Sequence, residues 1–279
     1  MDMRIFAREV FVSDVENLSD FNERIRRIET AFRNEQNCKD KTVNFQFFYR
    51  GDRACMSTQS NLFRYKLLSK EKRLFEKWQK GCAAKAAGKC AGDYCGKVMC
   101  LAQMQHYEAN TRLLDFSTDP FVALRFACGR VGENCRKKVT IYCTDQIDLT
   151  QSCPRNNEIE AAMMQLVTSD APPADQDAIL SQDIFIKVDR SFGRIDRQKG
   201  LFLFMGNHYH GDYNSKYIRN KKIAHELSST EGRGKLYPGY VGVLHIAASA
   251  VEKIRNDLEE IEIYKMDYLM DKKREGEEK

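Results

Sequence analysis

Arg50 stands in a short segment whose residue types could bind a phosphate group. In Phe48–Arg53 (FYRGDR), it follows an apolar run typical of a strand and precedes Gly51. A guanidinium can hold a phosphate through two hydrogen bonds, and a neighbouring glycine leaves room for the ligand. The alternative is an arginine at a sheet edge that forms a surface ion pair. Both interpretations place Arg50 at the end of a strand, where we expect Gly51 to permit a turn.

Residues 103–129 form a second segment, in which polar side chains are dense among apolar ones. The polar members are His106, Tyr107, Arg112, Asp115, Ser117 and Thr118. Polar groups need hydrogen-bond partners when they are buried. One interpretation is an internal Arg112–Asp115 ion pair, with a cap from Ser117 or Thr118 for the next helix. The density of polar groups favours the other interpretation, a pocket wall.

A third segment, residues 193–206, has a polar turn, Asp196–Gln198, directly before an apolar strand. Loops held by strands often carry site residues, although an ordinary turn would look the same. The second segment also allows a hydrolase, in which His106 is the general base and Asp115 orients it. A lone histidine beside a helix end more often has a structural role, so we rank the hydrolase last.

Helices and strands follow one another irregularly in the pattern of apolar residues. Spacings of three and four predict a helix over 14–35, opened by a capping box at Ser13–Glu16, and the box Ser249–Glu252 opens the last predicted helix. Other helices are expected at 69–80, 97–109, 120–128 and from 157 onward. Strands are expected at 44–49, 111–116, 139–143, 184–188, 200–205 and 240–246. This order predicts one α+β domain over residues 1–279.

Composition and charge narrow the class of protein. The hydrophobic fraction of 42% and the charged fraction of 30% are typical of a globular chain. The net charge of +5 is scattered, without a long Lys/Arg run, so it permits a nucleic-acid partner without indicating one. No apolar run is long enough for a signal-peptide core or a membrane span. We therefore expect a cytoplasmic protein with no membrane partner.

The ten cysteines are expected to be reduced thiols, with Cys128 and Cys143 in the core. Cysteines crowd in one place, at Cys82, Cys90, Cys95 and Cys100. Their spacings are longer than those of zinc knuckles. We therefore expect a Gly/Ala/Cys-rich surface loop over 81–96 and no metal site.

Together these segments resemble the FRG domain family, named for its Phe/Tyr-Arg-Gly motif. The matching motifs, which span about residues 44–205, are Tyr49-Arg50-Gly51, Leu62-Phe63-Arg64, Gln105-His106-Tyr107, Thr111–Ser117, Ala123–Ala127 and Arg197–Phe202. The chain departs from the family pattern at Glu108, where glycine is usual, and at Asn110, where proline is usual. The insert at 81–96 also looks specific to this chain.

The order of these motifs is similar to that of ADP-ribosyltransferases of the Arg-Ser-Glu type. Those enzymes have an Arg-Gly at the end of the first strand, an aromatic-x-Ser-Thr strand before a helix, and a Glu-x-Glu turn before a later strand. The corresponding positions here are Arg50-Gly51, Phe116–Thr118 and Asp196–Gln198. The resemblance implies a split β-sheet with flanking helices, which clamps NAD as the substrate that donates ADP-ribose.

The same resemblance implies roles for individual residues. Arg50 would grip the pyrophosphate or ribose of NAD, and Tyr49 or Tyr107 would stack on nicotinamide. The residues expected to bind NAD are Tyr49, Arg50, Gly51, His106, Tyr107, Arg112, Asp115 and Phe116. The expected catalytic residues are Arg50, Ser117, which would support the site, and Gln198.

Gln198 stands where enzymes of this type have a carboxylate that stabilises an oxocarbenium-like transition state. An amide keeps the hydrogen bond and loses the charge, which Asp115 or Asp196 could supply. We therefore expect an NAD-dependent ADP-ribosyltransferase that modifies a protein or a nucleic acid, as a toxin or phage-defence effector with a partner protein. The alternative is a module that keeps the clamp and binds a nucleotide or nucleic acid without catalysis.

Overall fold

Helices and an antiparallel sheet make up the computed structural model, which confirms the predicted α+β class. The described residues are 13–37, 46–56, 58–85, 98–129, 135–144, 156–169, 184–187, 193–206 and 239–270. The helices are α2 (Leu18–Asn37), α3 (Asn61–Arg64), α4 (Glu71–Lys85), α5 (Val98–His106), α6 (Pro120–Cys128), α7 (Asn156–Thr168), α9 (Gly193–Arg197), α11 (Val251–Glu259) and α12 (Met266–Met270). Short 3-10 turns lie at Leu68–Lys70, Ala248–Ala250 and Glu262–Tyr264.

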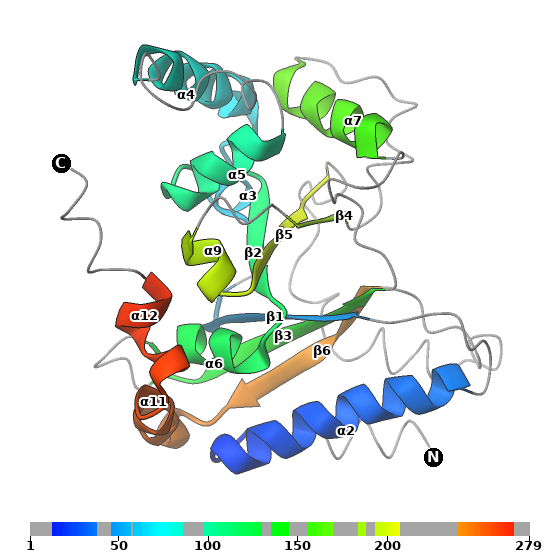
Figure 1. Cartoon of the computed structure of the whole chain (residues 1–279), viewed down its shortest axis with the longest axis vertical. Coiled ribbons are helices and arrows are strands. Elements are labelled where there is room, and N and C mark those ends of the chain that lie inside the picture. The colour runs from blue at the N-terminus through cyan, green and yellow to red at the C-terminus, as the bar shows by residue number, and fades with distance from the viewer. Residues whose placement is uncertain are drawn as a thin grey trace.

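The described strands pair in the order β4-β5-β2-β1-β3-β6. They are β1 (Gln46–Arg53), β2 (Leu113–Ser117), β3 (Lys137–Thr144), β4 (Ile184–Ile186), β5 (Gly200–Phe204) and β6 (Gly239–Ile246). β1 pairs with β3 along its whole length, whereas it pairs with β2 only at Tyr49 and Ser117. The sheet therefore consists of two halves, β4-β5-β2 and β1-β3-β6, which diverge on both sides of one residue pair (Figure 1).

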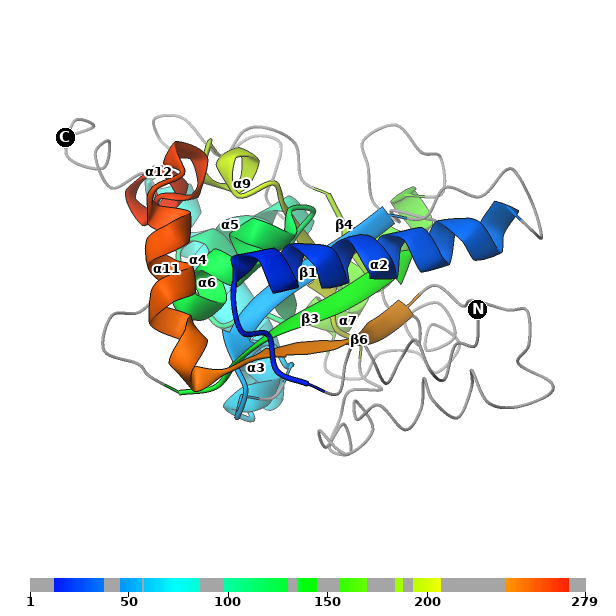
Figure 2. The ribbon, with the colours of Figure 1, turned by 90° about the horizontal axis from the view of Figure 1, so that it is seen from below.

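Each half of the sheet has its own hydrophobic core. Helices α2, α6 and α11 cover the β1-β3-β6 half (Figure 2). Phe21 of α2 and its apolar neighbours are buried in the core between these helices and the strands. Helices α4, α5 and α7 pack on the other half around residues such as Phe75. A third cluster joins strands of both halves, for example Phe48 of β1 and Phe185 of β4, whose ring centroids lie 4.7 Å apart. This third cluster fixes the angle between the halves.

The structure corrects both predicted capping boxes. Before α2, Val15 extends the sheet by a bridge to Ile246, and the side chain of Asn17 accepts from the amide of Asp20 at 2.9 Å. Before α11, the backbone forms a 3-10 turn and Ala250 precedes the helix without a side-chain cap. The start of α2 thus depends on the bridge from Val15 to Ile246 of β6. The start of α11 depends on the 3-10 turn that follows β6. Neither contact is visible in the local sequence.

The first five residues of the loop predicted at 81–96 are helical. Residues 81–85 are the last residues of helix α4, and residues 86–96, with Cys90 and Cys95, lie outside the described residues. Cys128 and Cys143 are buried, as predicted. The predicted strands at 44–49 and 184–188 also each extend into residues that are not described.

The expectation that Gly51 permits a turn is wrong, because β1 continues through Gly51 to Arg53. The role of Gly51 is to let helix α6 approach the strand. A Cβ atom added at Gly51 would lie 1.8 Å from the carbonyl oxygen of Ala123 and 2.7 Å from the amide nitrogen of Ala127. These are backbone atoms, so the helix itself would have to move.

We expect Gly51→Ala to destabilise the fold by about 3 kcal/mol, because it forces α6 away from β1. Unfolding in urea, monitored by circular dichroism, measures this loss of stability. Gly81→Ala is the matched control, since a Cβ at Gly81 in α4 meets nothing within 4 Å. The control should gain up to about 1 kcal/mol from helix propensity. Similar small effects of both substitutions would contradict the close approach.

Candidate functional site

The guanidinium of Arg50 spans the split between the two halves of the sheet. Its Nη1 donates to the backbone oxygen of Asp115 on β2 at 2.9 Å, and its Nη2 donates to the carboxylate of Asp52 at 3.3 Å. Its side chain is 17% exposed. Arg50 thus lies in the middle of β1, one residue past Tyr49, where the two halves diverge, with part of its surface open to a ligand.

Asp115 places a carboxylate beside Arg50. Its side chain is 58% exposed, and one oxygen lies 3.9 Å from Nη1 of Arg50. Gln105 of α5 donates to this carboxylate at 2.8 Å and accepts from the hydroxyl of Thr111 at 2.6 Å. Gln105 was part of a sequence motif without an assigned role; the structure makes it the residue that orients Asp115.

Ser117 and Gln198 meet, but through the backbone of residue 198. The hydroxyl of Ser117 donates to the carbonyl oxygen of Gln198 at 2.7 Å and accepts from the amide of Asp119 at 3.0 Å. The side-chain amide of Gln198 donates instead to the carbonyl of Leu269 in α12 at 3.0 Å. Segments 103–129 and 193–206 are therefore adjacent in space, and the side-chain amide of Gln198 is directed toward α12.

The start of α6 is capped by Asp119, which follows the two caps considered from the sequence, Ser117 and Thr118. Its carboxylate accepts from the amides of Phe121 at 2.9 Å and Val122 at 3.4 Å, and it also binds Nζ of Lys199 at 2.8 Å. The hydroxyl of Tyr264 donates to the same carboxylate at 3.3 Å. Burial, followed by the charge of Asp119, raises the pKa of Tyr264 to about 12.

The aromatic residues expected to contact nicotinamide occupy different environments. Tyr49 is 1% exposed in the first core, and its hydroxyl donates to Glu29 of α2 at 2.7 Å. Phe116 is buried in the third cluster. Tyr107 is 68% exposed, and its ring contacts those of His106 and Trp78. Of the two tyrosines, Tyr107 is therefore the one that can reach a ligand.

Arg112 forms a buried ion pair with Glu71 of α4, so the local Arg112–Asp115 pair considered from the sequence is wrong. Two of its nitrogens donate to the two carboxylate oxygens, one of them at 2.6 Å, and Nη1 donates to the carbonyl of Met205 at 2.9 Å. Burial raises the pKa of Glu71, and the Arg112 guanidinium opposes that rise. The pair ties α4 to the ends of β2 and β5.

Two further basic residues, Arg64 and Lys138, lie close to Asp52. Nη2 of Arg64 on α3 lies 3.8 Å from its carboxylate, and Lys138 of β3 is directly opposite Asp52 in the ladder. Burial lowers the pKa of Lys138; Arg50 and Arg64 lower it further, while Asp52 acts in the opposite direction. Lys138 was not predicted from the sequence. The available clue was a lysine within a buried strand, because lysine is rarely buried without a partner.

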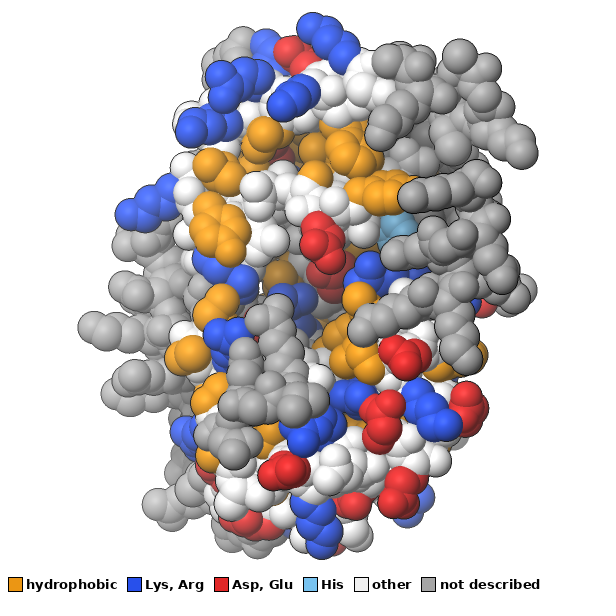
Figure 3. Space-filling model, turned by 90° about the vertical axis from the view of Figure 1, so that its left-hand side faces the viewer, with side chains coloured by type: hydrophobic (Ala, Val, Ile, Leu, Met, Phe, Trp, Pro, Cys, Tyr) orange, Lys and Arg blue, Asp and Glu red, His pale blue; other side chains and the backbone are white. Residues whose placement is uncertain are grey.

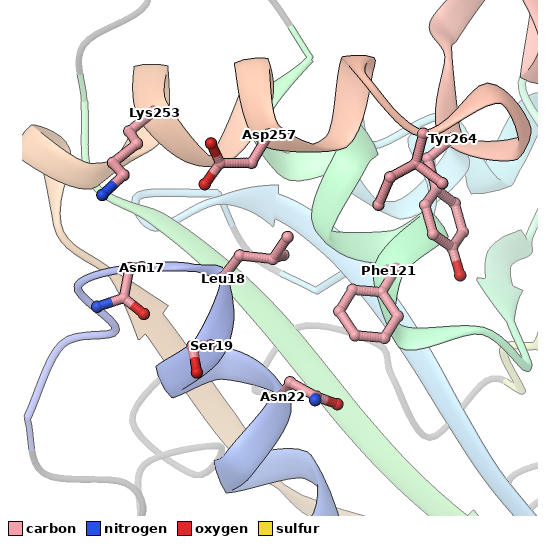
Figure 4. A pocket seen from close by; sticks show the side chains of 9 residues that line it. Asn17, Leu18, Ser19, Asn22, Phe121, Lys253, Asp257 and Tyr264 are labelled. Carbon is pink, nitrogen blue, oxygen red and sulfur yellow. The ribbon is translucent and has the colours of Figure 1, made fainter.

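Figure 3 shows a face of the molecule that is hollowed at mid-height, with acidic and basic side chains gathered in and around the hollow. A separate groove of about 530 Å³ lies between the start of α2, the start of α6 and α11 (Figure 4). It is lined by Leu18, Phe121, Asp257 and Tyr264 among others, and by none of Arg50, Ser117 and Gln198. The groove is thus distinct from the places where Arg50, Ser117 and Gln198 lie, although Phe121 of segment 103–129 contributes to its wall.

Comparison with known families supports the FRG resemblance. The family model of the FRG domain matches residues 45–135, about a third of the chain. The match covers β1, α3, β2 and α6, and therefore Arg50, Arg64 and Ser117, while Gln198 lies beyond it. Searches of curated proteins and of solved structures each found no match.

The described residues contain neither a metal-binding cluster nor a membrane-spanning helix. Among them, no cluster of three or more His, Cys, Asp or Glu side chains has the arrangement needed to hold a metal ion. In the same part of the chain, no helix combines the length and the apolar character that crossing a membrane requires.

We expect Arg112→Met to destabilise the protein by about 3–5 kcal/mol, because it leaves the buried Glu71 carboxylate without its partner. Urea denaturation checks the loss, and adding Glu71→Leu should restore most of it. Arg136→Met is the control, since it breaks an ion pair to Asp14 in which the arginine side chain is 48% exposed. The control should cost less than about 1 kcal/mol. Equal losses in both variants would contradict a structural role specific to the buried pair.

Proposed function

We propose that the protein is an NAD-dependent ADP-ribosyltransferase that binds NAD at the split of the sheet and modifies a macromolecular target. The observation that supports this most is Arg50, whose guanidinium crosses the split to Asp115 beside the Tyr49–Ser117 pair. A split sheet with flanking helices and an arginine on its first strand is the arrangement that the resemblance to Arg-Ser-Glu enzymes implies. The FRG match at residues 45–135 supports the motif part of that resemblance.

In this proposal, Arg50 binds the pyrophosphate or ribose of NAD, and Ser117 holds the turn before β5 through the carbonyl of Gln198. The glycosidic bond between ribose C1′ and the nicotinamide nitrogen breaks, and its electrons leave with nicotinamide. A nucleophile of the target then bonds to C1′ and loses its proton to a base or to water. Asp115, exposed beside Arg50, is the carboxylate that we assign to stabilise the cationic ribose.

The target is a protein or a nucleic acid, and the role that fits such an activity is a toxin or a phage-defence effector with a partner protein. The net charge of +5 inclines the protein toward polyanionic targets. Both kinds of target can be offered together in a cell extract.

We expect incubation with NAD labelled on the adenylate to leave label on a macromolecule of a cell extract. Arg50→Ala should reduce the label by at least about a hundredfold, because it removes the group that orients NAD. Nuclease and protease digestion identifies the class of target. Lys187→Ala is the control: it removes one exposed charge next to β4, an edge strand that is separated from β1 by β5 and β2 in the sheet. Absence of label together with absence of NAD binding would remove the proposal.

A non-catalytic nucleotide-binding module is the second candidate, and the side chain of Gln198 favours it. Its amide is bonded to the backbone of Leu269, and it carries no charge to stabilise a cationic ribose. In such a module the split would hold a nucleotide and release it unchanged. The protein would then act by binding alone.

The two candidates differ in the release of nicotinamide. If the module is correct, calorimetry should detect NAD binding while chromatography finds no nicotinamide, and Gln198→Ala should leave affinity within about twofold. If the enzyme is correct, Gln198→Ala should slow nicotinamide release more than it weakens binding, because the turn before β5 loses its contact with α12. Release by the wild type at a rate that falls with Arg50→Ala would reject the module.

A further inference from the structure

We infer that Arg64 and Lys138 join Arg50 around Asp52 to form a site for a phosphate-bearing anion. Under the proposed function, on which the identity of the ligand rests, this anion is the pyrophosphate of NAD. The site gives Arg64 and Lys138 a binding role, and it makes Asp52 the internal carboxylate with which the ligand competes.

The strand register brings these groups to one face of the sheet. Side chains alternate along a strand, so Arg50 and Asp52 share a face with Phe48 of the third cluster. On β3, Thr140 is directly opposite Arg50, and Lys138 is directly opposite Asp52. Opposite side chains have Cβ atoms about 5 Å apart, which brings all of them within reach of one small anion. The face thus changes from apolar to polar along its length.

Helix α3 supplies the second guanidinium. Nη2 of Arg64 lies 3.8 Å from the Asp52 carboxylate, whose other arginine partner is Arg50 at 3.3 Å. The side chains of Arg50 and Arg64 are 17% and 20% exposed. Two guanidiniums that converge on one carboxylate can converge equally well on the oxygens of a phosphate.

Counted over the described residues, the charges in this cluster do not balance. Three cations (Arg50, Arg64 and Lys138) face one sheltered carboxylate, Asp52, and the other nearby carboxylate, Asp115, is mostly exposed. Nζ of Lys138 donates to the carbonyl of Met56 in an environment that disfavours its charge. A bound anion would supply the missing negative charge where water screens it least.

Two buried polar atoms also indicate that the protein's own groups do not saturate the cluster. Nε of Arg50 and Oγ1 of Thr140 have no hydrogen-bond partner among the described residues. Buried polar atoms without partners destabilise a fold and are rare. Beside this excess of positive charge, the two atoms offer hydrogen-bonding capacity that an anion can use.

A purely structural cluster makes the opposite prediction about Asp52. If the carboxylate serves only to hold β1 and α3 together, Asp52→Asn weakens the fold and any anion binding with it. If it competes with a ligand, Asp52→Asn removes a repulsive charge and the ligand binds more tightly. The sign of the change in affinity therefore separates the two roles.

The test is calorimetry of the full chain with NAD, inorganic pyrophosphate, ADP-ribose and nicotinamide riboside, the last of which lacks phosphate. We expect Lys138→Met and Arg64→Gln each to weaken pyrophosphate and ADP-ribose binding about tenfold, Asp52→Asn to tighten both about three- to tenfold, and nicotinamide riboside to be unaffected. Lys187→Met, at the far edge of the sheet, is the control for removal of one charge. Thermal melts accompany each variant, and we expect Lys138→Met to melt no lower than the wild type.

The outcomes separate this inference from the proposed function. Binding of NAD that Lys138→Met, Arg64→Gln and Asp52→Asn all leave within twofold of the control rejects the anion site and leaves the enzyme intact. Pyrophosphate binding that shifts as expected, without NAD binding or transfer, retains the site and rejects the enzyme. A wild type that binds neither pyrophosphate nor ADP-ribose rejects the site, whatever the variants do.

Discussion

The pairing of Tyr49 with Ser117 is the constraint on which the rest of the structure depends, because it is where β1 and β2 meet. On either side of this pair the two halves of the sheet separate, and each carries its own helices and core. Both segments that flank the pair bear polar residues, Arg50 on one strand and Asp115 on the other. A sheet with continuous pairing would bury these groups in a ladder; the split leaves them facing a shared space.

Three contacts between distant parts of the chain keep this joint in place. Gly51 lets α6 rest on the β1 backbone, and the pair of Arg112 and Glu71 fastens α4 to the other half. Near the end of β2, the Asp119 carboxylate joins the start of α6 to Lys199. The apolar cluster that contains Phe48 fills the angle between the halves. The polar groups near the Tyr49–Ser117 pair are thus positioned by the close approach of α6 to β1 and by apolar packing. Some of their hydrogen-bonding groups therefore stay available to a ligand.

Periodicity in the sequence located most helices and strands, because apolar spacing reports directly which face of an element is buried. Periodicity failed where a residue distant in the sequence determines the local structure or the ion-pair partner. Val15 pairs with Ile246, so the expected helix cap became part of a sheet. Arg112 and Asp115 were a plausible local pair, but residues three apart on a strand point to opposite faces, and Arg112 found Glu71 forty-one positions away. Of the candidate site, Arg50 could be found from its motif; the role of Lys138 depends on register with Asp52, which no local pattern contains.

The hydrogen bond from Gln198 to Leu269 links the turn before β5 to the last described helix. The guanidinium of Arg197 also lies 5.9 Å from the centre of the Tyr268 ring, which strengthens the same link. A recombinant version truncated ahead of Tyr268 would therefore lose both attachments and leave that turn free to adopt other conformations. Preparations trimmed for crystallisation, or clipped by proteases during purification, would differ from the intact polypeptide at the place where Ser117 meets residue 198.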